Sequence, residues 1–268
     1  MATIIPIEPR HLEGALRLSQ AVGWPHRRTD WALLTDIGQG IAAVENGQVI
    51  GTALCVPFGD VAALNMIIVA DTHQGRGLGR RLTQDVIALA GPRTQSLVAT
   101  TAGLPLYRKL GFGPVVPIVQ HQGLATEPPT PARDVRKGGP EDLARVAALD
   151  LAATGMDRRA LLQRLLADGA LYVGEGGFAC RRDFGQGQVV GPIIASDAHE
   201  ARELLHAVTA DSAGRFLRVD SPEGAGLEPA LTALGLARVG GGIEMHNPPA
   251  VAKARQPARF ALYSQGLG

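Results

Sequence analysis

The hydrophobic positions in the first half of the chain follow the periods of helices and strands in turn. Residues 10–22 carry apolar side chains at helical spacing, and residues 78–90 predict a longer helix that Gly91-Pro92 ends. Shorter helices are predicted to begin near Thr29 or Asp30 and over residues 104–110. Strand composition is found in residues 3–8, 41–45, 48–56, 62–70, 96–99 and 113–120. The pattern predicts a mixed α/β (α+β) fold.

Two features place these strands in a sheet. Asn46-Gly47 separates the strands at 41–45 and 48–56, and this dipeptide is a strong signal for a two-residue hairpin. Residues 62–70 are almost entirely apolar, which favours a strand covered on both faces at the centre of a sheet. A central sheet flanked by helices is therefore predicted for this half.

The second half repeats the first at a nearly constant spacing. Cys55 has its counterpart in Cys180, and Met-Ile-Ile-Val-Ala-Asp at 66–71 has its counterpart in Pro-Ile-Ile-Ala-Ser-Asp at 192–197. Proline and glycine interrupt the pattern between the copies and again after Asn247. A tandem duplication is predicted, with a first domain at 1–125, a linker at 126–139, a second domain at 140–246 and a C-terminal tail at 247–268 that packs on the body.

Length and composition exclude several classes of protein. The 268 residues are 46% hydrophobic and 19% charged, which is typical of a globular chain and not of a disordered one. The net charge is +1 and the basic residues are dispersed, so neither a nucleic acid nor a membrane is expected as a partner. Cys55 and Cys180 are expected to be buried thiols, and no metal site is predicted. A cytoplasmic monomer or homodimer is the expectation.

The candidate chemistry lies where the apolar strand 62–70 enters a glycine-rich turn. Residues 71–81 read Asp-Thr-His-Gln-Gly-Arg-Gly-Leu-Gly-Arg-Arg and open the helix at 78–90. Such a turn presents unpaired backbone N–H groups to phosphate oxygens, and Gly77 and Gly79 carry no side chain that would block the approach. The neighbouring arginines add positive charge. A polyanionic ligand is therefore predicted here.

Two other phosphate-binding loops begin in the same way but fit less well. The nucleotide-triphosphate loop ends in Gly-Lys-Ser/Thr, where this chain has Leu-Gly-Arg at 78–80. The dinucleotide loop requires Gly-x-Gly-x-x-Gly, a spacing that Gly75, Gly77 and Gly79 do not have. It also expects an acidic residue about 20 positions further on, where the chain has Pro-Arg-Thr at 92–94. Neither alternative is retained.

The turn resembles the signature of the GNAT superfamily of N-acetyltransferases, Gln/Arg-x-x-Gly-x-Gly/Ala, which Gln74, Gly77 and Gly79 satisfy. A second motif follows at the family's distance, Leu-Tyr-Arg-Lys-Leu-Gly-Phe at 106–112. The resemblance is strong over residues 3–122 and extends weakly through the repeat to about residue 246. It implies two tandem GNAT-like domains, each with a mixed, mostly antiparallel central sheet flanked by helices, of which the second is degenerate.

The resemblance also implies an activity and a set of site residues. The expected reaction is transfer of acetyl from acetyl-CoA, or of another short acyl-CoA group, to a primary amine by direct attack in a ternary complex. Tyr107 matches the tyrosine that gives a proton to the departing thiolate. The expected cofactor-binding residues are Ile67, Ile68 and Val69 beside the pantetheine, Gln74, Gly75, Arg76, Gly77, Leu78, Gly79 and Arg80 around the pyrophosphate, and Thr100 where many members have asparagine.

The acceptor side is less well defined. Trp24 and Trp31 are candidates for a hydrophobic wall beside a small-molecule or peptide amine, although Trp31 in such a helix is more often a core residue. Several members carry a carboxylate on the fourth strand to take the proton of the amine, where this chain has Leu-Asn-Met at 64–66. No base is singled out among the candidates Asp71, His73, His26 and Asp30, for which a solvated surface position is favoured. The second-copy loop at 198–203 has no glycine and two glutamates, so it is expected to bind no cofactor. A non-catalytic acyl-CoA sensor is the alternative function.

Overall fold

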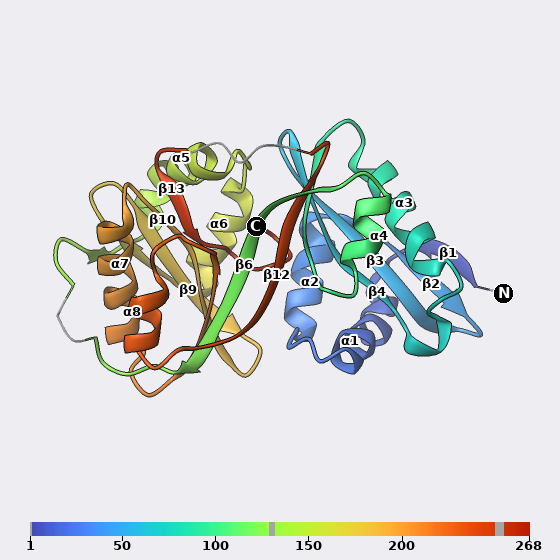
Figure 1. Cartoon of the computed structure of the whole chain (residues 1–268), viewed down its shortest axis with the longest axis horizontal. Helices are drawn as coiled ribbons and strands as arrows, with labels where there is room; N and C mark the ends of the chain where they lie inside the picture. Colours follow the sequence, from blue (N-terminus) through green and yellow to red (C-terminus); the bar gives the residue numbers. More distant parts are fainter. Residues whose placement is uncertain (1, 129–131, 250–254) are drawn as a thin grey trace.

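The computed structural model describes residues 2–128, 132–249 and 255–268. The strands of both halves form one continuous 13-stranded sheet, and Figure 1 shows the halves side by side with β6 and β12 running between them. The first half contains β1 (Thr3–Pro6), α1 (Leu12–Ala21), α2 (Arg28–Ile37), β2 (Gln39–Glu45), β3 (Gln48–Phe58), β4 (Val61–Val69), α3 (Leu78–Ala90), β5 (Thr94–Ala99), α4 (Leu104–Lys109) and β6 (Gly113–Leu124).

The second half repeats this order of elements. It contains β7 (Arg136–Lys137), α5 (Leu143–Thr154), α6 (Arg159–Asp168), β8 (Ala170–Val173), β9 (Phe178–Phe184), β10 (Gly187–Ala195), α7 (Ala198–Ala210), β11 (Phe216–Pro222), α8 (Glu228–Ala233), β12 (Ala237–Asn247) and β13 (Ala258–Ala261). Only the pairs β4–β5 and β10–β11 are parallel, and the other pairs among the described strands are antiparallel. The fold class is therefore the predicted one, a mixed, mostly antiparallel sheet flanked by helices.

The local signals in the sequence form the elements that they predict, with ends shifted by a few residues. Asn46 and Gly47 have φ angles of 50° and 76°, which a tight hairpin turn between β2 and β3 requires. The helix α2 begins at Arg28, slightly before the predicted start. Asp30 therefore lies in its first turn, where the carboxylate accepts the backbone N–H of Arg27 at 2.8 Å. Asp30 is the third residue of the helix, and its bond to the N–H of the N-cap residue Arg27 is one half of a capping box.

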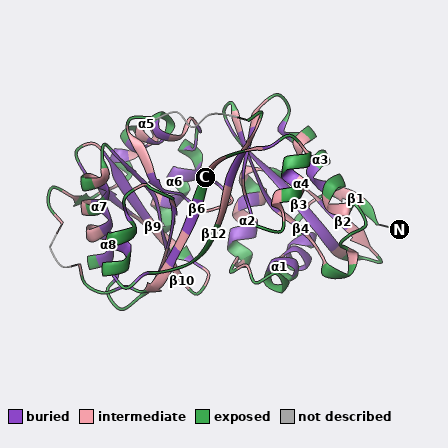
Figure 2. Cartoon of the chain, viewed as in Figure 1, coloured by how far each residue is buried: buried purple, intermediate pink, exposed green. Residues whose placement is uncertain are grey.

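The last strands of the two halves are exchanged, which the repeat does not reveal. β12, from the second half, pairs with β5 of the first half, while β6, from the first half, pairs with β11 of the second half. β6 and β12 also pair with each other along most of their length. Figure 2 shows buried strands on both sides of β6 and β12. One cluster of buried side chains contains residues of both halves, among them Trp31 and Leu161, so the halves share a core on the side of α1, α2, α5 and α6. The side chains beneath α7 and α8 form a second cluster, and those beneath α3 and α4 form a third, which includes Met245 of the exchanged strand β12.

Candidate functional site

The strands β4 and β5 separate in the middle of the first half. They pair only from Val61 to Ala63 on β4, although β4 continues to Val69. Met66 forms a bulge with a φ of 50°, and Thr52 Oγ1 donates to its carbonyl oxygen at 2.7 Å. A strand without a neighbour leaves backbone N–H and C=O groups free for another partner. The separation therefore exposes one edge of β4 to a ligand.

The three residues expected beside the pantetheine lie on this part of β4 but on different faces. Ile67 and Val69 are half-buried and pack with the residues of α3 and α4. Ile68 is 4% exposed and belongs to the core under α1 and α2. Its side chain therefore faces away from the opening, and only its backbone is available to a ligand there.

The glycine-rich turn joins β4 to α3 and is open. Gly75 and Gly77 have φ angles of 73° and 80°, which disfavour residues with a Cβ. Among the described residues, a Cβ built on either glycine would meet no atom within 4 Å, and no side chain caps α3 at Gly77. The first N–H groups of a helix have no acceptor within the helix and lie at its positive end. The turn has the space and the polarity to hold an anionic group.

The side chains of the turn divide into structural and solvent-facing groups. Gln74 Nε2 donates to the Val69 carbonyl at 3.1 Å and to Asp71 Oδ1 at 2.8 Å, which ties the turn to β4. Arg76 and Arg80 are exposed, and within the described parts of the chain neither forms an ion pair. Their charges are available to a ligand.

The helix α3 lies close to both β4 and α4. Leu78 is partly buried and packs against the core beneath α3 and α4. A Cβ on Gly79 would contact Val69 at 3.6 Å and Leu106 at 3.9 Å, so a glycine here lets the elements that carry both motifs approach one another.

Tyr107 and Thr100 lie on the other side of the opening. Tyr107 on α4 is 8% exposed and packs edge-to-face on Phe112 with ring centroids 5.9 Å apart. Burial raises the pKa of its phenol to about 12, so the proton is held at neutral pH. Thr100 follows β5, is exposed, and accepts the N–H of Gly103 at 3.2 Å. Its hydroxyl therefore supports the turn that leads into α4.

A cavity of about 400 Å³ adjoins the separation of β4 and β5. Its walls come from the loop between α1 and α2, the bulge of β4, the end of β5, the exchanged strand β6, the β9–β10 hairpin, β11 and the C-terminal segment. The lining residues are Gly23, Trp24, Pro25, His26, Leu64, Asn65, Met66, Val98, Thr100, Gln120, Gln122, Phe184, Gly185, Gln186, Phe216, Arg218, Gly241, Ser264, Gln265 and Gly266. Both halves of the chain and the tail therefore shape it.

The two tryptophans have different places. Trp24 lines the cavity, and its ring lies 5.9 Å from that of His26, centroid to centroid. Trp31 is fully buried, and its Nε1 donates to Ser19 Oγ at 3.1 Å. Trp31 as a wall residue is therefore corrected, and the alternative of a core role holds, because its ring packs in the core beneath α1 and α2.

Three of the four candidate bases are held outside the cavity wall. Asp71 accepts from Gln74, and His73 lies 3.1 Å from a carboxylate oxygen of Glu45.

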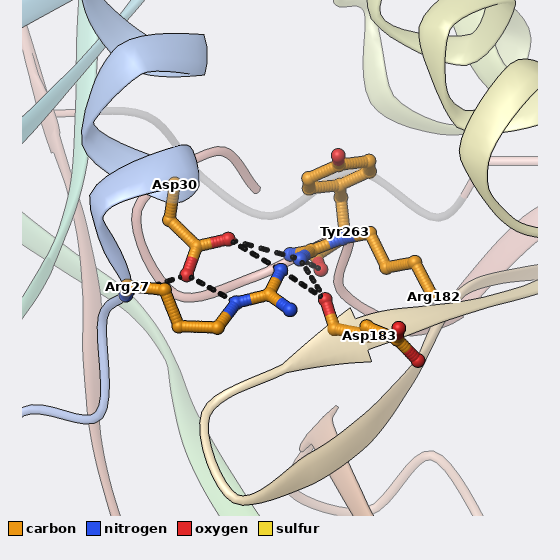
Figure 3. Close-up of polar contacts among 5 residues, drawn as sticks. All are labelled: Arg27, Asp30, Arg182, Asp183 and Tyr263. Carbon is orange, nitrogen blue, oxygen red and sulfur yellow. Dashed lines mark hydrogen bonds and ion pairs between the residues drawn. The ribbon is translucent and has the colours of Figure 1, made fainter.

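Asp30, the third of these candidates, accepts from Arg27, whose Nη2 also donates to the Asp183 carbonyl at 2.7 Å. Figure 3 shows this cluster, in which Arg182 lies 3.9 Å from Asp30 and stacks over Tyr263. The cluster joins the start of α2 to the β9–β10 hairpin.

His26 is the candidate base that lines the cavity. Burial lowers the pKa of its imidazole to about 4; Asp30 opposes this shift, and Arg218 and Arg182 add to it. Its Nδ1 is buried and has no hydrogen-bond partner among the described residues. The ring is therefore neutral at physiological pH and offers an unused nitrogen.

The corresponding region of the second half is closed. Asp197 caps α7 by accepting the N–H of Glu200 at 2.9 Å, and the Glu200 carboxylate accepts the N–H groups of Ser196 at 2.9 Å and Gly176 at 2.6 Å. Negative charge already occupies the positive end of this helix. A phosphate would meet both carboxylates there.

The tail fills the separation between β10 and β11. β13 pairs antiparallel with β10 from Ile193 to Ala195, and Leu262 N–H donates to the Asp220 carbonyl of β11 at 2.8 Å. β10 and β11 themselves pair only at Gln188 and Val189. The space that is open in the first half is thus occupied by the chain itself in the second.

Several cavity residues escaped the sequence analysis. The Gln-x-Gln pattern of Gln120 and Gln122 and the charged pair Arg218 and Asp220 interrupt otherwise apolar strands, and this signal could have drawn attention to them. Their meeting depends on the exchange of β6, which no local pattern encodes. Within the described ranges no cluster of three His, Cys, Asp or Glu residues could hold a metal, and no helix is long and apolar enough to cross a membrane.

Comparisons with known proteins agree with this geometry. A model of the acetyltransferase (GNAT) family matches residues 12–112, and a model of the acetyltransferase (GNAT) domain matches residues 146–258. The chain is 29% identical over 287 residues to YitH of Bacillus subtilis (strain 168), described as an uncharacterized N-acetyltransferase, with 99% of this chain and 98% of that protein covered. The chain belongs to the GNAT acetyltransferases and carries two GNAT domains in tandem.

Two solved structures share the fold of the whole chain. A protein from Pyrococcus horikoshii that is assigned to the acetyltransferases has a TM-score of 0.85 at 18% identity, covering 100% of this chain and 96% of that one. A tandem GNAT protein from the clavulanic acid biosynthesis pathway has a TM-score of 0.65 at 14% identity, covering 92% and 98%. The tandem arrangement therefore recurs in proteins of low sequence identity.

Proposed function

We propose that the first half binds acetyl-CoA, or another short acyl-CoA, and that the enzyme transfers the acyl group to a primary amine held in the cavity. The observation that carries this proposal is the open glycine turn beside the separation of β4 and β5. The amine would attack the thioester directly in a ternary complex. The compartment proposed for the reaction is the cytoplasm, and the acceptor is a small-molecule or peptide amine.

The residues of the opening fit the parts of the cofactor. The backbone at Gly75 and Gly77 and the N-terminus of α3 would hold the pyrophosphate, with Arg76 and Arg80 beside it. Ile67 and Val69 would contact the pantetheine arm, and the unpaired edge of β4 would supply its hydrogen-bond partners. When bound, the cofactor supplies an activated acetyl group as a thioester.

Tyr107 would supply the proton that the leaving group needs. In the transfer, the bond from the acetyl carbon to sulfur would break and a bond from that carbon to the amine nitrogen would form. The amine would lose one proton to solvent water, and Tyr107 would take up a proton from water to replace the one given to sulfur. Burial keeps the phenol protonated at neutral pH, so a proton is available to the departing sulfur, although the raised pKa makes the phenol a weaker acid than a thiol. Cys55 and Cys180 are 3% and 1% exposed, and burial raises the pKa of both thiols, which argues against a covalent acyl-cysteine route.

Release of free thiol from acetyl-CoA in the presence of an amine panel tests the proposal. The full chain should release thiol and form an N-acetyl product with at least one amine. A protein that binds acetyl-CoA but releases thiol with no amine would instead be a sensor. A protein that does not bind acetyl-CoA would remove the assignment of the turn.

A further inference from the structure

The charges that line the cavity restrict its substrate. Arg218 is the one charged side chain among the described lining residues, and that set contains no aspartate or glutamate. Its Nε and Nη2 pair with the two carboxylate oxygens of Asp220 at 2.9 and 3.0 Å. Nη1 has no acceptor among the described residues, so one edge of the guanidinium remains for a ligand. A planar guanidinium edge is suited to a carboxylate.

Several contacts fix the Arg218–Asp220 pair, of which Arg218 lines the cavity. Asp220 has a side-chain exposure of 1% and also accepts from Gln265 Nε2 at 2.8 Å. The Arg218 guanidinium lies over the Phe184 ring, 5.5 Å from its centroid, and the His26 ring meets the same phenylalanine edge-on at 5.4 Å. The cation is therefore placed before any ligand arrives, which lowers the entropic cost of binding.

A second group in the wall is suited to an amine. Asn65 on the β4 bulge is 6% exposed, and its Nδ2 donates to the Ala63 carbonyl at 3.3 Å. This bond uses the NH₂ group of the amide. The amide oxygen, Oδ1, is buried and receives no hydrogen bond from any described residue. A buried acceptor without a donor costs free energy, which a ligand N–H would recover. Asn65 lies two positions before Ile67, which the proposed function places beside the pantetheine arm.

We infer that the amine acceptor is an amino-acid-type molecule, in which a carboxylate is bound by Arg218 and the reacting amine donates to Asn65 Oδ1. This inference rests on the proposed function. A polyamine or an aminoglycoside would place a second ammonium in a cavity whose described wall offers a cation and no anion. A simple amine would leave the free edge of Arg218 without a partner in the occupied cavity. The cavity of about 400 Å³ suits a compact acceptor.

Matched substrates test the inference on the unmodified full chain. Thiol release from acetyl-CoA is measured with the common amino acids, with their decarboxylated amines, and with spermidine and kanamycin. The best amino acid should exceed its decarboxylated counterpart by about 10²-fold in kcat/KM, because a buried charged hydrogen-bond partner is lost without the carboxylate. Equal or faster turnover of decarboxylated amines or polyamines would overturn the inference and leave the proposed function standing. Absence of thiol release with every amine would overturn both.

A double variant assigns the preference to Arg218. Arg218→Gln with Asp220→Asn removes both charges together, so no unpaired buried charge remains. The amino-acid preference should fall to within about 3-fold, mainly through a higher KM for the amino acid, while KM for acetyl-CoA is unchanged. The control is Arg238→Gln with Glu223→Gln, an ion pair of 3.0 Å that is about half exposed. A double variant that keeps the full preference would refute the role of Arg218.

Discussion

Ile193 of β10 pairs in the sheet with Ala261 of β13. The counterpart of Ile193 in the first repeat is Ile67, which lies on the part of β4 that has separated from β5. Equivalent positions of the two repeats therefore differ in their neighbours. In the second half Ile193 pairs with the tail strand β13, and in the first half Ile67 has no pairing with β5. Binding of an extended ligand to a sheet edge requires a free edge.

We therefore expect one acetyl-CoA per chain. In the second half, the Glu200 carboxylate occupies the start of α7, where a pyrophosphate would bind, and β13 occupies the edge of β10, where a pantetheine would bind. The equivalent places in the first half are open. Calorimetric titration of the full chain should give a stoichiometry of one. Two equivalent sites per chain would contradict the assignment.

Replacement of Gly77 by glutamate should abolish binding of acetyl-CoA. The new side chain would lie in the open space of the turn and would bring negative charge to the position proposed for the pyrophosphate. Gly214→Glu is a matched control, because Gly214 has a φ of 74° and a Cβ added to it would likewise meet no atom of the described residues within 4 Å. Calorimetry should show loss of binding in the first variant and an unchanged affinity in the second. Equal affinity in both folded variants would remove the phosphate assignment.

Replacement of Tyr107 by phenylalanine should lower kcat by about 10- to 10³-fold, the range expected for loss of one general acid. Affinity for acetyl-CoA should change little, because the ring and its contact with Phe112 remain. Tyr172→Phe, at a tyrosine of the second half whose hydroxyl donates to Asp211, should leave kcat unchanged. Steady-state kinetics with a saturating amine would decide. Full activity of the Tyr107 variant would mean that water or substrate provides the proton.

The attachment of the tail predicts a pH dependence of stability. Burial alone would raise the pKa of Glu244, but the charge of Arg259 on β13 and the hydrogen bonds from His246 and Arg259 lower it from 4.5 to about 2. The ionised carboxylate therefore stabilises the fold above pH 4.5, and this contribution is lost as the pH falls toward 2. Arg259→Gln should reduce the free energy of unfolding by about 3 kcal/mol at pH 7, since a buried charge is left unpaired.

Urea unfolding between pH 7 and pH 3 tests this dependence. The deficit of the Arg259 variant should shrink as Glu244 takes up a proton, whereas Arg238→Gln, at an exposed pair, should have a small effect at every pH. A deficit that does not change with pH would show that the contribution of Arg259 does not depend on the charge of Glu244.

Local signals predicted most of the first half and the position of the turn. Asn46-Gly47, the apolar strand at β4 and the glycines before α3 each determine structure within a few residues, so the sequence alone indicates them. The cavity could not be predicted in this way. Asn65, Arg218 and Gln265 are far apart in sequence, on β4, on β11 and in the tail, and they line one cavity only in the folded chain. For Trp31 the sequence left both a core role and a place in a substrate wall open, and its full burial decides for the core.

The exchange of β6 and β12 has a consequence for how such a chain can change. Two identical copies that traded these strands would form a domain-swapped homodimer, and here one covalent chain holds both partners at a fixed, high effective concentration. A dimer of identical subunits must alter both sites with every substitution. In the fused chain each half can change by itself. One half can therefore keep an open cofactor site while the other half forms part of the wall of the cavity beside it.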